Sequence, residues 1–376
     1  MRRVHRALLA ATSALAVIAA PASAATGPDE PDRAGLQQRL DDVVRAGAVG
    51  ALAEVRDGHR VWRGSSGVAQ LGRSRAVPVH GRFRAGSITK TFVATVVLQL
   101  VDKGRLQLDD TVDRWLPGAV PDGDRITVRE LLNHTSGLPD VVPTLPMPPS
   151  REFFANRWRT WTSAELVRRA LANAPTDPKQ PPPGSEFVYS STGYLLLGQI
   201  IKQVTGHSYG DEIKHRIIRR LHLHGTSMPG TFPRIRGPHP HGYVPTRPDP
   251  EDPRLLDYTQ MNPSVFGAAG ELISTTRDLN KFFAALLDGR LIPDHLLEEM
   301  KTPGVEGARY GLGLAFWQDT SCGVPVYGND GDALAYQAWS YSTADGSRQV
   351  TVALTPDFHG DADNAVDAFV DEAICG

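Results

Sequence analysis

Strand patterns occur at the two ends of the chain and not in its middle, and this distribution constrains the fold more than any other feature. Apolar side chains alternate with period two over residues 49–55, and the Asp57-Gly58 turn signal leads into a second short run at 61–63. Helical patterns at 36–46 and 365–374 flank the strands. Further strands are predicted near the C-terminal end, at 310–317, 324–328, 334–341 and 348–354. The arrangement predicts an α/β (α+β) fold, in which an antiparallel sheet of about five strands is flanked by N- and C-terminal helices.

The middle of the chain is predicted to be mainly helical. A capping box formed by Thr127 and Glu130 opens one helix. Other helical patterns occur at 91–102, 163–172, 192–204 and 211–221. The proline-rich segments between helices are predicted to be surface loops, at 143–149, 175–183 and 228–253. We therefore expect an α/β domain, an inserted helical domain and an active site at their interface, with the boundaries 25–90 and 260–376 for the first and 91–259 for the second.

The first 24 residues have the pattern of a signal peptide. Three arginines precede an apolar run at 7–20, and the small residues Ala22-Ser23-Ala24 form a signal-peptidase site. The run is shorter than the roughly 20 residues of a membrane-spanning helix, so an N-terminal anchor is the weaker alternative. We expect cleavage near Ala24, a secreted extracellular protein and no stable membrane insertion.

The balance of charges argues against nucleic-acid binding. The chain has 40 Lys and Arg against 42 Asp and Glu, a formal net charge of −2, so it has no basic excess to neutralise phosphates. Its 41% hydrophobic and 22% charged residues are typical of a globular protein and exclude a disordered or collagen-like chain. We expect a monomer that acts on a small-molecule or peptide substrate.

The two cysteines, Cys322 and Cys375, are predicted to form a disulfide. An exported protein matures in an oxidising compartment, where an even number of cysteines favours pairing. Neither cysteine lies in a cluster of histidines or carboxylates that would bind a metal.

His134 is not predicted to be a base, and the histidines in two close pairs are not predicted to be metal ligands. The close pairs at 222–224 and 239–241 lack an accompanying cysteine or a helical His-Glu frame. His134 lies near the end of a predicted helix and is interpreted as a capping or packing residue. We therefore predict no metal site and no cofactor.

Ser87-Ile88-Thr89-Lys90 is the first candidate for catalytic chemistry. Of the seven lysines, only Lys90 has a serine three residues before it. Positions i and i+3 of a helix lie on one face, so the Lys90 amine can lie beside the Ser87 hydroxyl and take its proton. The N–H groups of a helix N-terminus also stabilise a developing oxyanion. The pattern predicts a nucleophilic serine, although Ser-x-x-Lys alone also fits an ordinary helix start.

The surroundings of this motif resemble serine β-lactamases and D-alanyl-D-alanine carboxypeptidases, most closely class C β-lactamases and the secreted streptomycete DD-carboxypeptidases. The matching stretches, in chain order, are 83–92, 131–138, 183–184, 193–198 and 269–275. Segments 321–323 and 375–376 resemble the cysteine pair of the streptomycete enzymes. The resemblance covers nearly the whole chain after residue 24, and it implies acyl-serine chemistry without a cofactor.

Tyr189-Ser190-Ser191 resembles the Tyr-x-Asn motif of this family. There the tyrosine exchanges protons with the serine and the lysine, and the asparagine binds the amide of the substrate. The resemblance therefore implies that Tyr189 is the general acid and base, together with Lys90. Ser191 stands at the substrate-binding position but departs from the pattern, because a hydroxyl is shorter than a carboxamide.

Asn329-Asp330-Gly331-Asp332 stands at a strand edge where the family usually has Lys-Thr-Gly or His-Thr-Gly. The four residues are candidates for substrate binding and for the oxyanion hole, in which the N–H of Asp332 would pair with that of Ser87. Gly331 permits close approach of the backbone to a substrate. A carboxylate at Asp330 would repel the terminal carboxylate of a D-Ala-D-Ala substrate if it faced the cleft. The same four residues also fit a simple turn.

These features together predict a secreted serine hydrolase that resembles D-alanyl-D-alanine carboxypeptidases and cleaves peptide or amide bonds of the cell-wall type. An esterase, a D-amino-acid amidase or a β-lactamase on the same scaffold is the first alternative, favoured by the altered second and third motifs. A non-catalytic binder of cell-wall peptides is the second alternative.

Overall fold

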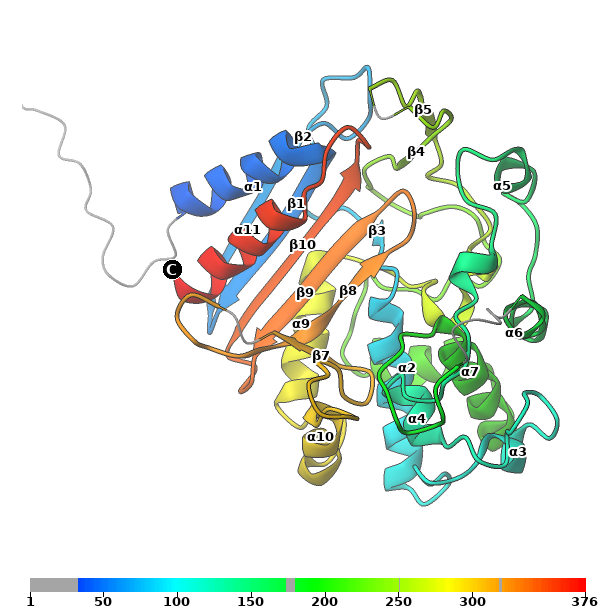
Figure 1. The fold of residues 1–376 in the computed structure, drawn as a ribbon. Coiled ribbons are helices and arrows are strands. Elements are labelled where there is room, and N and C mark those ends of the chain that lie inside the picture. Colours follow the sequence, from blue (N-terminus) through cyan, green and yellow to red (C-terminus); the bar gives the residue numbers. More distant parts are fainter. Residues whose placement is uncertain (1–32, 174–179, 250, 318–319) are drawn as a thin grey trace, which may run out of the picture. The chain divides into compact units, whose positions relative to one another are not determined.

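The computed structural model describes residues 33–173, 180–249, 251–317 and 320–376, and one antiparallel sheet of six strands organises them (Figure 1). Across the sheet the strands are β2 (Arg60–Gly67), β1 (Ala48–Asp57), β10 (Arg348–Pro356), β9 (Gln337–Thr343), β8 (Val326–Asp332) and β7 (Ala315–Trp317). β1 from the N-terminal part pairs directly with β10 from the C-terminal part. The predicted α/β fold is confirmed, with six strands in place of about five.

Two helices from opposite ends of the described chain cover one face of this sheet (Figure 1). They are α1 (Arg33–Gly47) and α11 (Asp363–Cys375), which pack against each other and against β1, β2 and β10. Leu40 of α1 and Phe369 of α11 are fully buried in this layer. The predicted N- and C-terminal helices that flank the sheet are therefore confirmed.

The predicted disulfide between Cys322 and Cys375 is present, with Cα atoms 5.6 Å apart. It joins the last residue of α11 to the segment before β8 and closes a separation of 53 residues. On the loop-entropy model, a cross-link of this length stabilises the folded state by up to about 4 kcal/mol.

The other face of the sheet is covered by α9 (Thr276–Leu287), which contacts β1, β9 and β10. Its buried Asn280 donates to the carbonyl oxygen of Glu54 (3.0 Å) and accepts from the hydroxyl of Thr351 (2.6 Å). These bonds satisfy the polar groups at the interface, so α9 can be buried against the sheet without leaving an unpaired amide.

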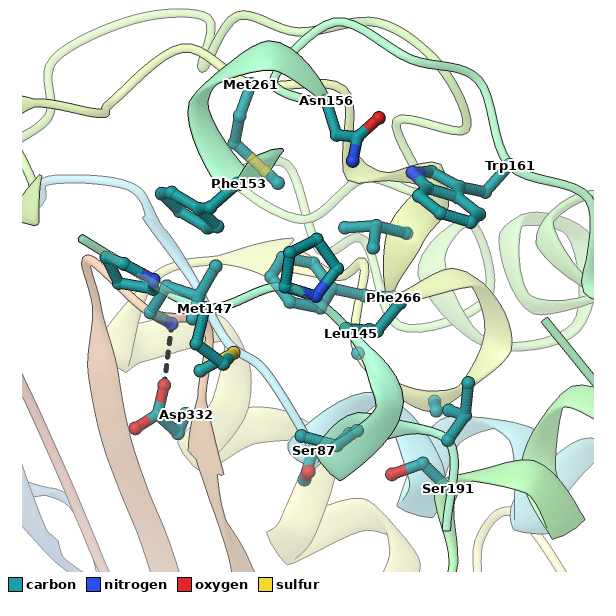
Figure 2. A pocket seen from close by; sticks show the side chains of 18 of the residues that line it. Ser87, Leu145, Met147, Phe153, Asn156, Trp161, Ser191, Met261, Phe266 and Asp332 are labelled. Atoms are coloured by element: carbon teal, nitrogen blue, oxygen red, sulfur yellow. Dashed lines mark hydrogen bonds between the residues drawn. The ribbon is translucent and has the colours of Figure 1, made fainter. Parts of the chain in front are cut away.

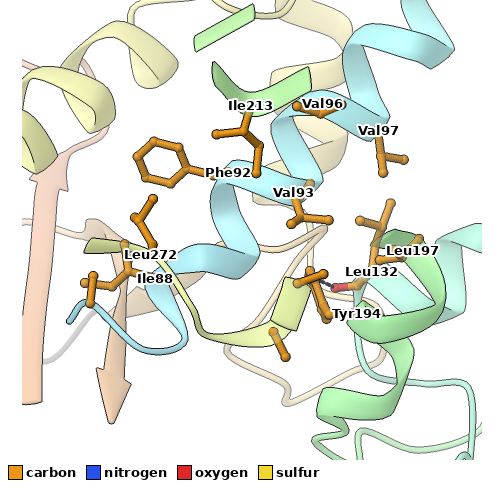
Figure 3. Packing of buried hydrophobic residues seen from close by; sticks show 14 of the residues in the cluster. Ile88, Phe92, Val93, Val96, Val97, Leu132, Tyr194, Leu197, Ile213 and Leu272 are labelled. Carbon is orange, nitrogen blue, oxygen red and sulfur yellow. Dashed lines mark hydrogen bonds between the residues drawn. The ribbon is translucent and has the colours of Figure 1, made fainter. Parts of the chain in front are cut away.

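Helix α2 (Ile88–Asp102) is the centre of the helical part. Every residue from Ile88 to Leu100 is buried, which explains its nearly continuous apolar sequence. Phe92, Val96 and Val97 pack in a cluster with side chains of neighbouring helices (Figure 3). Those neighbours include α4 (Val128–Leu132), α7 (Ser191–Thr205) and α8 (Tyr209–Ile213). The remaining helices outside the sheet layers are α3 (Val112–Trp115), α5 (Arg151–Ala155), α6 (Ser163–Ala172) and α10 (Asp294–Lys301).

Several element boundaries differ from the sequence prediction. α2 begins at Ile88 and not at residue 91, so Lys90 lies in its first turn. The helix predicted at 211–221 is α8 followed by a π-helical turn at Lys214–Ile218. The loop predicted at 228–253 contains the short strand β4 (Tyr243–Pro245), which pairs with β5 (Leu255–Asp257). The capping box of Thr127 and Glu130 is confirmed in front of α4.

The strand predicted at 324–328 is β8, and it runs on to Asp332. The third motif therefore lies inside a strand and not in a turn after it. Two-residue strands, β3 (Phe83–Arg84) and β6 (Ile273–Ser274), pair with each other immediately before α2 and α9.

None of the helices in the described part of the chain is both long and apolar enough to cross a membrane. The predicted signal peptide, residues 1–24, lies outside the described residues, so cleavage near Ala24 and export stay predictions.

Candidate active site

Ser87 and Lys90 lie at the N-terminus of α2, as the motif predicts. Ser87 is the N-cap residue, and the Lys90 side chain follows it on the same face of the first turn. The Lys90 Nζ donates to Ser87 Oγ (2.9 Å) and to the carbonyl oxygen of Ala269 (3.0 Å). Lys90 is only 1% exposed, so these two bonds fix a buried amine beside the serine hydroxyl.

Tyr189 completes this group from a different part of the chain. It lies two residues before α7, and its hydroxyl donates to Ser87 Oγ (2.8 Å). The Lys90 Nζ lies 4.8 Å from the centre of the Tyr189 ring. The structure therefore brings the three residues predicted to be catalytic together around one serine oxygen.

A cavity of about 430 Å³ opens beside Ser87. Figure 2 shows aromatic and sulfur-containing side chains gathered above Ser87 and Ser191. The apolar walls are formed by side chains that include Leu145, Met147, Phe153, Trp161, Met261 and Phe266. Among the described residues that line the cavity, Lys90 is the only cation, and the acids are Asp140 and Asp332.

The sequence was compared with models of known protein families. The family model described as Beta-lactamase matches residues 33–374 of the chain. The chain belongs to the beta-lactamase family. With its Ser-Lys-Tyr group, this family member is a serine hydrolase.

Two relatives of known sequence are named penicillin-binding proteins. Penicillin-binding protein 4 of Amycolatopsis lactamdurans is 32% identical over 327 residues, which cover 80% of this chain and 79% of that protein. Penicillin-binding protein 4* of Bacillus subtilis is 31% identical, but the match covers 68% of this chain and only 55% of that protein.

Two solved structures share both the fold and a substantial part of the sequence. A D-stereospecific amidohydrolase from a Streptomyces species is 39% identical, with a TM-score of 0.81, and the match covers 90% of this chain and 98% of the other. A D-amino acid amidase from Ochrobactrum anthropi, complexed with L-phenylalanine amide, is 30% identical, with a TM-score of 0.78 and coverage of 91% and 97%.

The third motif, residues 329–332, does not lie in the cavity as a whole, although all four residues were candidates for substrate binding. Asn329 is 2% exposed, and its amide donates to the hydroxyls of Thr91 and Tyr310 (both 3.2 Å). Asn329 therefore faces α2 and does not line the cavity. Burial raises the pKa of Tyr310, so this phenol stays protonated at neutral pH.

The Asp330 side chain, which would repel a substrate carboxylate only if it faced the cleft, does not line the cavity. Asp330 pairs with Trp339 of β9, which packs in the layer of α1 and α11. Residues directly opposite each other on neighbouring strands lie on one face, and successive residues lie on opposite faces. The Asp330 side chain thus points to the face opposite to that of Asn329. Repulsion of a substrate carboxylate by Asp330 is no longer a reason to exclude a peptide substrate.

Gly331 permits a close approach, but the chain itself occupies the space. A Cβ at Gly331 would lie 2.0 Å from the carbonyl oxygen of Ala85 and 2.7 Å from the Ser87 nitrogen. A Cβ at Gly86 would lie 2.6 Å from the carbonyl oxygen of Asp332 and 2.7 Å from its nitrogen. Only glycines let β8 and the turn before α2 pack so closely. The backbone of β8 at Gly331 and Asp332 therefore lies directly against the turn that precedes α2.

Replacing Gly86 by alanine should therefore damage both stability and the site. Gly86 has φ of +51°, and the Cβ of an alanine there would overlap the backbone of Asp332. We therefore expect the rate at which a probe labels Ser87 to fall at least about tenfold. Gly72→Ala is the matched control, because Gly72 has φ of +74° but nothing within 4 Å of its Cβ. The control should lose about 1 kcal/mol in urea unfolding and keep its labelling rate. Equal labelling rates in the two variants would contradict the close approach.

Asp140 is a cavity residue that the sequence analysis missed. Its Oδ1 accepts from the N–H of Ser191 (2.9 Å) and from that of Val142 (3.3 Å). A single aspartate ahead of a proline-rich loop carries no pattern from which a binding role could be predicted. Ser191 and Asp332 also line the cavity, and the Oδ1 of Asp332 accepts from the N–H of Leu334 (Figure 2).

Proposed function

We propose that the protein hydrolyses amides of D-amino acids that have a free amino group and an apolar side chain. This proposal rests on the charged side chains that line the cavity. The Asp140 carboxylate lines the cavity and can accept from a substrate ammonium, whereas Lys90 is the only cation among the described lining residues and is already bonded to Ser87. An ammonium gains charge-assisted hydrogen bonds in such a cavity, and a terminal carboxylate does not.

The names of the relatives support two reactions of the same class. The structural relatives named D-stereospecific amidohydrolase and D-amino acid amidase support the proposed one. The relatives named penicillin-binding protein support the alternative, a D-alanyl-D-alanine carboxypeptidase. Both reactions pass through an acyl-serine, and they differ in whether a carboxylate lies beyond the bond that is cleaved.

The size and polarity of the cavity favour a bulky apolar side chain on the substrate. Phe153, Trp161 and Phe266 line it, together with methionines that adapt to different shapes. Burial of an aromatic side chain there would contribute roughly 1.5–3 kcal/mol to binding. An aromatic D-amino acid amide is thus a better fit than one with a methyl side chain.

In the acylation step, Ser87 Oγ attacks the amide carbon. The Ser87 proton passes to Tyr189 or to Lys90, one of which must first be unprotonated, because both donate to Oγ in this structure. The N–H groups of Ser87 and Asp332 stabilise the oxyanion. As the C–N bond breaks, the same proton goes to the leaving ammonia or amine.

In the deacylation step, a water molecule attacks the acyl carbon of the ester on Ser87. Tyr189 takes a proton from this water, and the proton returns to Ser87 Oγ when the ester bond breaks. The products are the free D-amino acid and the unmodified serine, so the cycle needs no cofactor.

Three substrates test the proposal: D-phenylalanine amide, its N-acetyl derivative, and an N-acylated D-Ala-D-Ala peptide. We expect kcat/KM for D-phenylalanine amide to exceed that for the acetyl derivative by about ten- to hundredfold, since a charge-assisted hydrogen bond contributes roughly 1.5–3 kcal/mol. Asp140→Asn, which keeps an oxygen for the Ser191 N–H, should reduce this preference and leave hydrolysis of the acetyl derivative nearly unchanged. Faster hydrolysis of the peptide than of the free amide would favour the carboxypeptidase instead.

A further inference from the structure

His134 forms the buried wall behind Tyr189. It follows Asn133, the C-cap residue of α4, and adopts a left-handed conformation with φ of +61°. His134 is 1% exposed, whereas Tyr189 is 37% exposed. The two ring centres lie 4.2 Å apart with an interplanar angle of 32°. One side of the Tyr189 ring thus rests on His134 while part of the tyrosine remains open to solvent.

Two acceptors of His134 hold the backbone on either side of Tyr189. The carbonyl oxygen of His134 accepts from the N–H of Val188 (2.8 Å), and its Nδ1 accepts from the N–H of Ser190 (3.1 Å). His134 is 55 residues away from Tyr189 in sequence, so these bonds are long-range constraints on the segment before α7. They fix the position from which the Tyr189 hydroxyl reaches Ser87.

The imidazole is neutral in this environment. Since Nδ1 accepts a hydrogen bond, the single ring proton lies on Nε2, which is buried without a hydrogen-bond partner among the described residues. Burial, and then the positive charge of Lys90, hold the pKa of His134 well below its ordinary value. None of the hydrogen bonds found among the described residues joins His134 to Ser87, so a role as the base for that serine has no support.

We propose that His134 is a positioning residue for Tyr189, acting through the Nδ1 bond to the Ser190 N–H and through the contact between the two rings. This inference rests on the proposed role of Tyr189 in proton transfer. The contact between Tyr189 and Ser87 is 2.8 Å long, and a misplacement of about 1 Å at such a contact can slow a reaction by roughly 10²-fold. His134 contributes to catalysis by preventing that misplacement.

Three substitutions of His134 distinguish the effect of the hydrogen bond to Ser190 from the effect of the ring contact with Tyr189. His134→Asn keeps a side-chain oxygen that can accept from the Ser190 N–H and tolerates positive φ, but it loses the ring. His134→Phe keeps a ring and loses the acceptor, and His134→Ala loses both. We expect the rate of fluorophosphonate labelling of Ser87 to fall about tenfold or more in the Ala variant and by less in the Asn variant. His222→Asn is the control, because His222 also has positive φ (+50°) and is exposed, and it should change the rate less than twofold.

A double-mutant cycle with Tyr189→Phe distinguishes positioning from a general structural effect. Tyr189→Phe keeps the ring that contacts His134 and removes the hydroxyl. If His134 acts through that hydroxyl, His134→Ala and His134→Asn should each slow labelling less than threefold in the Tyr189→Phe background. Equal losses in both backgrounds, or no loss in either, would overturn the positioning role. Tyr189→Phe labelling as fast as wild type would instead overturn the proposed role of Tyr189 itself.

Discussion

Replacing Ser87 by alanine should abolish covalent labelling by a fluorophosphonate or a penicillin and reduce amide hydrolysis by at least about 10⁴-fold. Loss of a nucleophile removes the acyl-enzyme route altogether, and the residual rate comes only from binding and oxyanion stabilisation. Ser87 Oγ accepts hydrogen bonds from both Lys90 Nζ (2.9 Å) and the Tyr189 hydroxyl (2.8 Å). Intact-protein mass spectrometry should show one adduct on the wild type and none on the variant.

Ser163→Ala is a suitable control for this experiment. Ser163 is also at the start of a helix, α6, but the residue three positions later is Leu166 and not a lysine. This control should be labelled at the wild-type rate. An adduct that persists in Ser87→Ala would identify another nucleophile and would refute the assignment.

Lys90→Met and Tyr189→Phe should each slow labelling of Ser87 by roughly 10²–10⁴-fold, the usual contribution of a general acid or base. Methionine preserves most of the length of the buried lysine side chain, so the loss reports on the amine and not on a cavity. Because both groups serve one proton transfer, the double variant should lose much less than the product of the two single losses. The labelling rate with a fluorophosphonate measures these effects independently of the natural substrate.

Lys202→Met on the exposed face of α7 is the matched control, and it should change the rate less than twofold. The far-ultraviolet circular dichroism and the midpoint of urea unfolding should show that all variants are folded. A loss smaller than about tenfold in both Lys90→Met and Tyr189→Phe would mean that proton transfer takes another route.

The sequence determined the identity of the reacting group because the required pattern is local. A serine and a lysine three residues apart at the start of a helix lie on one face wherever the helix packs. α2 begins at Ile88, three residues before the predicted start at residue 91, because the helix begins directly after the left-handed turn at Gly86, whereas the apolar run begins at residue 91. The antiparallel sheet was also predictable, since period-two alternation and tight-turn signals are short-range features.

Only the tertiary structure decided which side chains face the cavity. Along β8 the side chains alternate, so Asn329 and Asp330 face opposite layers, and a strand predicted to end at residue 328 could not reveal this. The role of Asp140 depends on its hydrogen bond with Ser191, which is 51 residues away in the sequence. The role of His134 depends on its hydrogen bond with Ser190, which is 56 residues away. Local periodicity contains no information about contacts between distant segments. Those contacts depend on how α4, α7 and the sheet pack together, and so the nucleophile was readable from the sequence while its substrate pocket was not.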